Sequence, residues 1–468
     1  MKKNNKKRHL SKKTLIYSIG TITSCIAVLL AAPIYTRTLS TSEFGNYELS
    51  YSLIFLLCTV GFFDIHTAML RFMYGETEES EEAKNKAIYS SGFLVIILVA
   101  LLFLTVPLTS IITTLPFVKA SIFYGIFFSL ANFYQNVARG SDKDLEYSLA
   151  FSIYHIVNLA TVIYLLVGRK YSSWSLLIAM GTGHIIEIIY LEIKLKVIKN
   201  FKSKYIDFRL IKRMFKFALP LAVSALGTWI LNYYTNIQIV KLMDAHSNGI
   251  YSMAVNIARS IPSISFGLLM AWQEVAFSFK GDLAEKKVYF SKAIEKILVF
   301  LSLVYIFFLC GATLVIPYYL DSSYLPVLNV LFLVTGCMTF ETISNMMASI
   351  FGNSINSKPI MVSILIGAIT DLIILGPFIN KWGIVGAGYA SLIGFGLTSI
   401  IRVVWIMKAE KLKINVKKIL FYVCLSFVGA YIGKMKDQKI LIITAVITGI
   451  MLLINVKKDR SKKDEKYS

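Results

Sequence analysis

One arginine lies deep inside a long apolar stretch of this sequence, where a charge is costly and usually faces a cavity or a partner. Arg259 is about twelve residues into its stretch, or roughly 18 Å at the rise of an α-helix. Pro262 then removes a backbone donor and predicts a kink beside Arg259. We expect Arg259 to line a cavity and bind an anionic substrate. The alternative is a buried ion pair with an acid on another helix.

The segment GFFDIHTAMLRF carries three more ionisable residues, Asp64, His66 and Arg71. Asp64 and Arg71 are seven residues apart, so they share one face of a helix. They form either a structural ion pair or part of a substrate site. His66 titrates near neutral pH if it faces a wet cavity, and otherwise packs as a hydrogen-bonded side chain. Arg37, at the end of the first apolar stretch, can extend its long side chain to water.

The segment GTGHIIEIIY places His184 and Glu187 three residues apart, which makes them neighbours on a helix. Such a pair suits a proton or cation site. The sequence places no further ligand beside it, so no metal site is predicted. Asp371 lies near the middle of another apolar stretch and is a candidate acidic partner or coupling group.

The composition indicates a membrane protein. Hydrophobic residues make up 56% of the chain and charged residues 16%, with a mean hydropathy of +0.65. A soluble chain is about half apolar and about a quarter charged. Runs of about twenty apolar residues fit membrane-spanning helices and are too long for barrel strands. The prediction is an all-α polytopic membrane protein with about fourteen transmembrane helices. Their expected limits are 14–36, 48–73, 87–112, 115–138, 147–168, 173–195, 214–241, 248–279, 290–318, 325–353, 358–380, 384–408, 417–433 and 438–456.

The distribution of positive charge predicts the orientation. Most of the 49 Lys and Arg residues lie in the N-terminal segment, the loops after even-numbered spans and the C-terminal tail. The positive-inside rule then places both termini in the cytoplasm. The net charge of +22 follows from this topology. Because the basic residues are scattered over separate loops, nucleic acid is not an expected partner, whereas anionic membrane lipids are.

An internal repeat divides the chain. When the sequence is shifted by 204 positions, Gly45 falls on Gly249 and Tyr47 on Tyr251. Both copies begin on the same side of the membrane, as in a parallel repeat of a transporter. We therefore predict two six-helix lobes related by a pseudo-twofold axis.

The predicted domains follow from that repeat. The N-terminal six-helix lobe spans residues 1–198 and a cytoplasmic amphipathic linker spans residues 199–213. The C-terminal six-helix lobe spans residues 214–408, and residues 409–468 hold two extra helices and a basic tail.

The sequence contains no P-loop, no GxSxG, no HExxH and no nucleotide-binding fingerprint. The five cysteines lie in apolar runs without a CxxC pair, which favours small packing residues over redox or metal chemistry. We therefore predict a protein that is not an enzyme, needs no cofactor, and draws energy from an ion gradient, the membrane potential or substrate flux. Tyr and Phe near span ends are typical of an interfacial belt, and inward-facing rings could instead stack on sugars.

Three stretches resemble one protein family. GTITSCIAVLLAAPIYTRTLSTSEFGNYELSYSLIFLL resembles the first two spans of bacterial oligosaccharide repeat-unit flippases of the Wzx type, the polysaccharide biosynthesis proteins. FFDIHTAMLRF is similar to the end of their second span, and WGIVGAGYASLIG to their glycine-rich entry to span twelve. The resemblance covers nearly the whole chain. The motifs are shared with the superfamily of multidrug, oligosaccharidyl-lipid and polysaccharide exporters.

The resemblance implies a function. Such proteins move a lipid-linked oligosaccharide, usually on undecaprenyl pyrophosphate, across the bacterial cytoplasmic membrane for capsule, exopolysaccharide or O-antigen synthesis. Two lobes rock around a central cationic cavity by alternating access, and a polymerase and glycosyltransferases are the implied partners. Arg37 and Arg259 match cavity arginines of related peptidoglycan-precursor flippases, and Arg71 matches more weakly. Arginine suits a pyrophosphate because it stays charged and binds it with two parallel hydrogen bonds.

Other functions are open at this stage. A lipid II or teichoic-precursor flippase would use the same fold. A multidrug cation antiporter would favour acids over arginines in its cavity. A scaffold for a polymer-synthesis complex would not transport at all.

Overall fold

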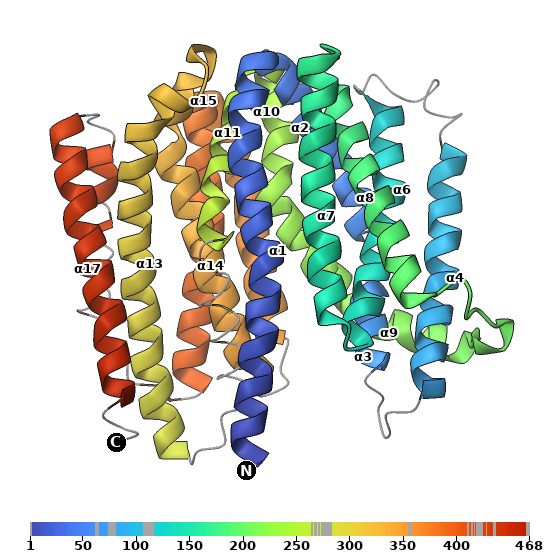
Figure 1. Cartoon of the computed structure of the whole chain (residues 1–468). Helices are drawn as coiled ribbons and strands as arrows, with labels where there is room; N and C mark the ends of the chain where they lie inside the picture. The colour runs from blue at the N-terminus through green and yellow to red at the C-terminus, as the bar shows by residue number, and fades with distance from the viewer. Residues whose placement is uncertain are drawn as a thin grey trace. The chain divides into compact units, whose positions relative to one another are not determined.

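The structure is a computed structural model of the whole chain. Within it, the described residues are 2–60, 65–73, 81–105, 117–263, 265, 269, 272, 283–353, 358–409, 411–412, 415, 417, 425–426, 428–433 and 437–464. The chain divides into two compact units, Met1–Gly249 and Ile250–Ser468. Figure 1 shows the helices of both units.

The first unit is built from helices of very different length. Its α-helices are α1 (Lys2–Thr38), α2 (Thr41–Val60), α3 (Ile65–Met73), α4 (Glu81–Thr105), α6 (Val118–Gly140), α7 (Asp144–Val162), α8 (Trp174–Leu195), α9 (Phe208–Trp229) and α10 (Thr235–Leu242). Two π-helical turns, η1 (Ile163–Gly168) and η3 (Ile230–Tyr234), interrupt this order, as does the 3₁₀ turn η2 (Ser203–Tyr205).

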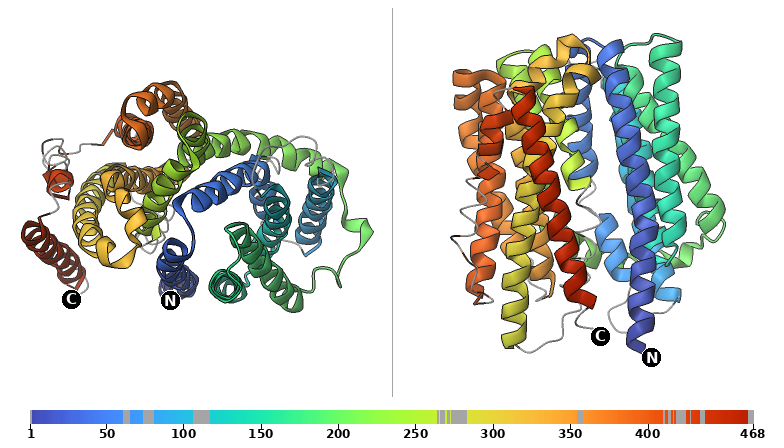
Figure 2. Two further views of the ribbon diagram at one scale, coloured as in Figure 1. Left: turned by 90° about the horizontal axis from the view of Figure 1, so that it is seen from above. Right: turned by 60° about the vertical axis from the view of Figure 1, so that its left-hand side comes forward.

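The second unit has fewer and longer helices. Helix α11 (Ala245–Ala258) begins in the first unit and continues into the second. The others are α13 (Leu283–Tyr319), η4 (Ser322–Asn329), α14 (Leu331–Asn353), α15 (Lys358–Ala409) and α17 (Gln438–Asp464). Helices α13 and α17 lie side by side (Figure 2).

The all-helical, multi-span prediction is confirmed. Helices are the only regular secondary structure among the described residues. Within that part of the chain, seven helices are long and apolar enough to cross a membrane, or eight with one bent pair. The predicted count of fourteen spans stays a prediction. Large apolar side chains are exposed along α4, including Ile96 at 64% and Phe103 at 65%, as expected for a surface that lipid covers.

The core of the first unit forms around α8. Helices α6 and α7 both pack against α8, and α1 packs against α7. Close packing depends on glycine: a Cβ at Gly183 would meet Tyr154 on α7, and one at Gly181 would overlap Phe123 on α6. Small residues that let helices approach are typical of membrane proteins.

The two glycines of the internal repeat pack against one another's helix. A Cβ at Gly45 in α2 would overlap the carbonyl of Ala245, and one at Gly249 in α11 would overlap that of Thr41. Asn248 Nδ2 donates to the Gly45 carbonyl at 2.8 Å, and the Thr41 hydroxyl is hydrogen-bonded to a ring nitrogen of His246. We call this contact the glycine crossing. The sequence echo therefore marks a place where two backbones meet without side chains between them.

In the second unit, α15 is a hairpin of two antiparallel arms. At Gly383 the backbone leaves the helical conformation with φ 58°, a value that glycine adopts without steric cost. This turn falls between the predicted spans 358–380 and 384–408. The arms stay close, since a Cβ at Gly386 would overlap the Phe378 carbonyl and one at Gly367 would overlap Thr398.

Candidate functional site

A buried ion-pair site lies between helices of the first unit. Nδ1 of His184 is 2.9 Å from Oε2 of Glu187, as the i, i+3 spacing predicted. The other carboxylate oxygen, Oε1, accepts a 2.6 Å hydrogen bond from Nε2 of Gln135 on α6. Glu187 has no exposed surface and His184 is 5% exposed. Both oxygens of this buried carboxyl group are therefore hydrogen-bonded, which offsets much of the free-energy cost of removing the group from water.

Aromatic rings enclose the imidazole of His184. Tyr154 on α7 stacks on it with a centroid distance of 4.1 Å and an interplanar angle of 14°. Tyr124 and Phe128 on α6 contact it at 5.9 and 5.7 Å. The ring faces pack against the imidazole while its Nδ1 keeps the contact with the Glu187 carboxyl group. The arrangement is a buried, hydrogen-bonded pair of a histidine and an acid, the residue types that carry protons or cations inside membrane proteins.

The three predicted substrate arginines belong to different helices. Arg37 is exposed in the last turn of α1, and Arg71 is exposed in the last turn of α3. Arg259 is half-buried directly after α11 ends, and its Nη1 donates to Oδ1 of Asn256 at 2.9 Å. Asn256 is a neutral partner that lies one turn earlier, in α11. The α-helix is interrupted there because Pro262 cannot donate to a carbonyl one turn earlier.

The predicted cluster on the second span is only partly described. His66 is half-buried in α3. Asp64 lies outside the described residues, so its predicted pairing with Arg71 stays a prediction. No placement of these residues tests whether they bind substrate.

Asp371 in α15 is fully buried. Within the described part of the chain, neither of its carboxylate oxygens has a hydrogen-bond partner. It lies one helical turn beyond Gly367, where the two arms of the hairpin touch. A carboxyl group in such a place is either neutral or occupied by a bound cation, because an isolated charge there would cost several kcal/mol. The depth of Asp371 was predicted; its lack of partners was not.

Arg402 is a second buried charge of α15, and sequence reasoning missed it. Its guanidinium donates to the Ser363 hydroxyl at 2.8 Å, the Ser344 carbonyl at 2.9 Å and the Ile360 carbonyl at 3.3 Å. With 2% of its surface exposed, it ties the two arms of α15 to α14. The signal was present, because Arg402 interrupts an apolar run as Arg259 does.

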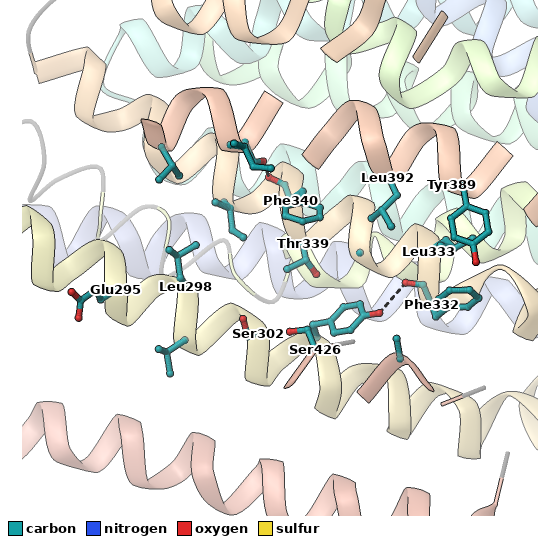
Figure 3. A pocket seen from close by; sticks show the side chains of 18 of the residues that line it. Glu295, Leu298, Ser302, Phe332, Leu333, Thr339, Phe340, Tyr389, Leu392 and Ser426 are labelled. Atoms are coloured by element: carbon teal, nitrogen blue, oxygen red, sulfur yellow. Dashed lines mark hydrogen bonds between the residues drawn. The ribbon is translucent and has the colours of Figure 1, made fainter. Parts of the chain in front are cut away.

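An apolar pocket opens among the helices of the second unit. Its volume is 390 Å³, and α13, α14 and α15 line it together with Ser426 and Ala430. Figure 3 shows Leu298, Phe332 and Leu392 around it and Glu295 toward one end. Tyr305 turns its hydroxyl to the Phe332 carbonyl at 3.1 Å, so this polar group is satisfied and the wall stays largely apolar. The pocket suits a hydrocarbon chain, and no sequence pattern had indicated it.

Gln135 and Tyr154, which contact the His184–Glu187 pair, were also not predicted from the sequence. Gln135 belongs to the polar run NFYQNVARG inside an apolar helix, and this polarity was the available signal. Tyr154 was one of 26 tyrosines, so composition alone gave it no distinction. Both come from other helices than α8, and only packing brings them to the pair.

Comparisons with known proteins place the chain. The fold is similar to that of the lipid II flippase MurJ in an inward closed conformation, with a TM-score of 0.71 and 16% identity over 95% of this chain and 99% of that one. An inward-facing multidrug resistance MATE family transporter of the MOP superfamily is similar with a TM-score of 0.65 and 12% identity, over 85% of this chain and 94% of that one. An outward-facing transporter of the same family is similar with a TM-score of 0.60 and 14% identity, over 86% of this chain and 95% of that one.

No curated protein sequence matches this chain. The model of one family, described as polysaccharide biosynthesis protein, matches residues 10–273. The expected family resemblance is thereby confirmed. Since the match covers more than half of the sequence, the chain belongs to the polysaccharide biosynthesis protein family.

Proposed function

We propose that this protein moves a lipid-linked oligosaccharide from the inner to the outer leaflet of the bacterial cytoplasmic membrane by alternating access. Family membership and the MurJ-like and MATE-like fold support a flippase or transporter. MurJ is a lipid II flippase, and the substrate proposed here is of the same chemical type. Enzymes that build and polymerise the oligosaccharide are the partners that this function would need. The proposal also includes a cytoplasmic location for both termini of this chain.

The observation that carries the lipid-linked substrate is the pocket of the second unit. A 390 Å³ cavity with a largely apolar wall accepts a section of a polyprenyl chain, which is hydrocarbon throughout. It would bind a hydrated cation or a free sugar poorly, since either would lose its hydrogen bonds to water. This favours a hydrocarbon chain over a free sugar as the ligand of the pocket.

The pyrophosphate is assigned to the arginines. Arg259 lies at a break in the helix, where its side chain is half-buried and donates to Asn256. A guanidinium binds phosphate oxygens with two parallel hydrogen bonds and cannot be deprotonated in a protein. Arg37 and Arg71, both exposed, are assigned to the arrival and departure of the same group.

We assign energy coupling to the His184–Glu187 pair. The imidazole and the carboxyl group lie 2.9 Å apart and are buried inside the first unit, and histidines and acids in such places form the proton relays of transporters. Asp371 is the second candidate, because a buried carboxyl group without described partners can take up a proton or a cation. His66 and Asp64 remain weaker candidates.

Complementation of a strain that lacks the gene tests the substrate. Arg259→Ala is expected to lower surface-polymer export about tenfold or more at normal protein level, because a charge-assisted contact is lost. Ser302→Trp, which fills the pocket from α13, is expected to have a similar effect. Ile373→Trp is the matched control, since that α15 side chain is 68% exposed and lies outside the pocket. Intact export in both Arg259→Ala and Arg37→Ala strains would contradict the proposal.

The alternatives give different outcomes in the same strains. Essentiality of the gene and accumulation of lipid II would identify a lipid II flippase. Resistance to cationic dyes would identify a multidrug antiporter. Full polymer synthesis in the Ser302→Trp strain together with lost export after deletion would support a scaffold.

A further inference from the structure

Four half-buried aromatic rings gather around α2 in the first unit. Tyr51 and Phe55 lie one turn apart on α2 with centroids 5.8 Å apart. Tyr233 of η3 contacts both, at 5.9 and 4.9 Å, and Phe128 of α6 contacts Phe55 at 5.6 Å. Each ring keeps part of its surface exposed although three helical segments meet there. We call these four residues the aromatic platform.

A π-helical turn positions one of these rings. The helix that begins as α9 and ends as α10 passes through η3 (Ile230–Tyr234), which contains Tyr233. A π turn adds a residue to the turn and rotates the side chains that follow; such turns are frequent at functional sites. Here the turn brings Tyr233 against Tyr51 and Phe55. The irregular backbone therefore serves the ring cluster.

Hydrogen bonds fix the backbone behind the platform. Asn236 donates from Nδ2 to the hydroxyl oxygen of Ser52, the residue after Tyr51, at 2.8 Å. Nε1 of Trp229 donates to the Ser52 carbonyl at 2.9 Å. All three residues are buried. The rings are thus held in place before any ligand arrives, which reduces the entropy lost on binding.

The platform differs from the surface that lipid covers. Along the apolar second half of α4 the exposed large side chains are aliphatic or phenylalanine, for example Ile96, Leu101 and Phe103. The platform combines two tyrosines with two phenylalanines, and it lies where α2 meets α6 and the α9–α10 helix. A ligand there would meet ring faces together with hydroxyl groups.

We infer that the aromatic platform binds a sugar ring of the transported glycan. One face of a pyranose presents C–H groups with a slight positive charge, and the face of an aromatic ring is negative, so the two attract. Tyrosine adds a hydroxyl that can bond to sugar hydroxyls. The inference rests on the proposed function, because it assigns the sugar part of that substrate to the first unit.

Binding of two ligands to the purified protein tests the platform. Undecaprenyl pyrophosphate without sugar is the first probe, and the lipid-linked oligosaccharide extracted from a deletion strain is the second; native mass spectrometry gives both dissociation constants. The wild type is expected to bind the sugar-bearing probe more tightly. Tyr233→Leu and Phe55→Leu are each expected to weaken that binding about tenfold and to leave binding of undecaprenyl pyrophosphate unchanged.

Two variants keep the test interpretable. Tyr233→Phe retains the ring and is expected to bind the oligosaccharide within about threefold of the wild type, because stacking carries most of the contact. Phe127→Leu is the matched control: it lies on the same helix as Phe128, is half-buried, and contacts Phe123 at 4.9 Å outside the platform. Unfolding temperatures in detergent identify any variant that fails to fold.

Each outcome decides something different. If the wild type binds the oligosaccharide more tightly and the leucine variants do so as well, the platform is overturned and the proposed function stands. If the wild type binds neither probe, the proposed function fails and the platform fails with it. Tyr233→Leu could also weaken the binding of both probes equally while Tyr233→Phe and Phe127→Leu bind them normally. That result would overturn a sugar-specific role of the platform.

Discussion

Two buried carboxyl groups, one in each unit, lie in opposite surroundings. Glu187 is bonded by His184 on its own helix and by Gln135 from a neighbouring helix. Asp371 is equally buried, yet no described residue offers it a hydrogen bond. Arg402, a buried cationic group of that second unit, is bonded elsewhere, to Ser363 and two carbonyls. Loss of a buried acid that is bonded to other buried groups leaves those groups without a partner, whereas loss of an acid without described partners breaks no such bond.

The largest expected effect is on Glu187. Glu187→Ala leaves the buried His184 and the half-buried Gln135 without their shared partner, and should lower the free energy of unfolding by about 3–5 kcal/mol. Denaturation in detergent micelles, followed by tryptophan fluorescence, measures the change. Glu82→Ala is the control, since its pair with Lys86 is exposed and contributes little. If Glu187→Ala and Glu82→Ala lowered the free energy of unfolding equally, the buried pair would be no more important for stability than the exposed one.

Arg402 should be the counterpart of Glu187 in the second unit. Arg402→Met keeps the volume roughly constant and removes one donor each from the Ser344 carbonyl, the Ile360 carbonyl and the Ser363 hydroxyl, at a cost of about 2 kcal/mol. The Ile360 carbonyl still accepts from the Ser363 hydroxyl. The same denaturation assay applies. Arg209→Met, on an exposed side chain of α9, should change stability by less than about 0.5 kcal/mol. A small loss for Arg402→Met would mean that this arginine is not structural.

The coupling between His184 and Glu187 should be smaller than either single loss. A double-mutant cycle with His184→Phe and Glu187→Gln is expected to give an interaction energy of about 1.5 kcal/mol. Phenylalanine preserves the ring that stacks on Tyr154, so the cycle isolates the bond to the carboxyl group. Additive effects would show that the two side chains are neighbours without energetic coupling.

Asp371 should give the smallest change in stability. Asp371→Asn removes the ability to ionise but breaks no described hydrogen bond, so the free energy of unfolding should change by less than about 1 kcal/mol. Transport by the same variant should fall if the group binds a proton or a cation. A loss above about 2 kcal/mol would reveal a structural partner and make the two acids alike.

Sequence patterns predicted what depends on a single helix. The all-helical membrane class followed from run length, and the His184–Glu187 contact followed from spacing along one turn. The turn at Gly383 also fell between two predicted spans. In each case the determining interactions lie within a few residues, so periodicity and local geometry suffice.

Features made by several helices were not predictable in the same way. Gln135 and Tyr154 reach His184 and Glu187 from α6 and α7, and no local pattern encodes that meeting. The apolar pocket is assembled from separate helices whose residues look like ordinary lipid-facing positions. The aromatic platform depends on a π turn, which has no reliable sequence signature.

The glycine crossing also constrains how the chain is made. Gly45 packs against the helix that carries Gly249, a residue that the ribosome adds 204 positions later. At about 5–20 residues per second, the start of α2 waits roughly 10–40 s for its partner. During that interval the backbone around Gly45 lacks this partner. The first unit therefore completes the glycine crossing only when synthesis has passed the middle of the chain.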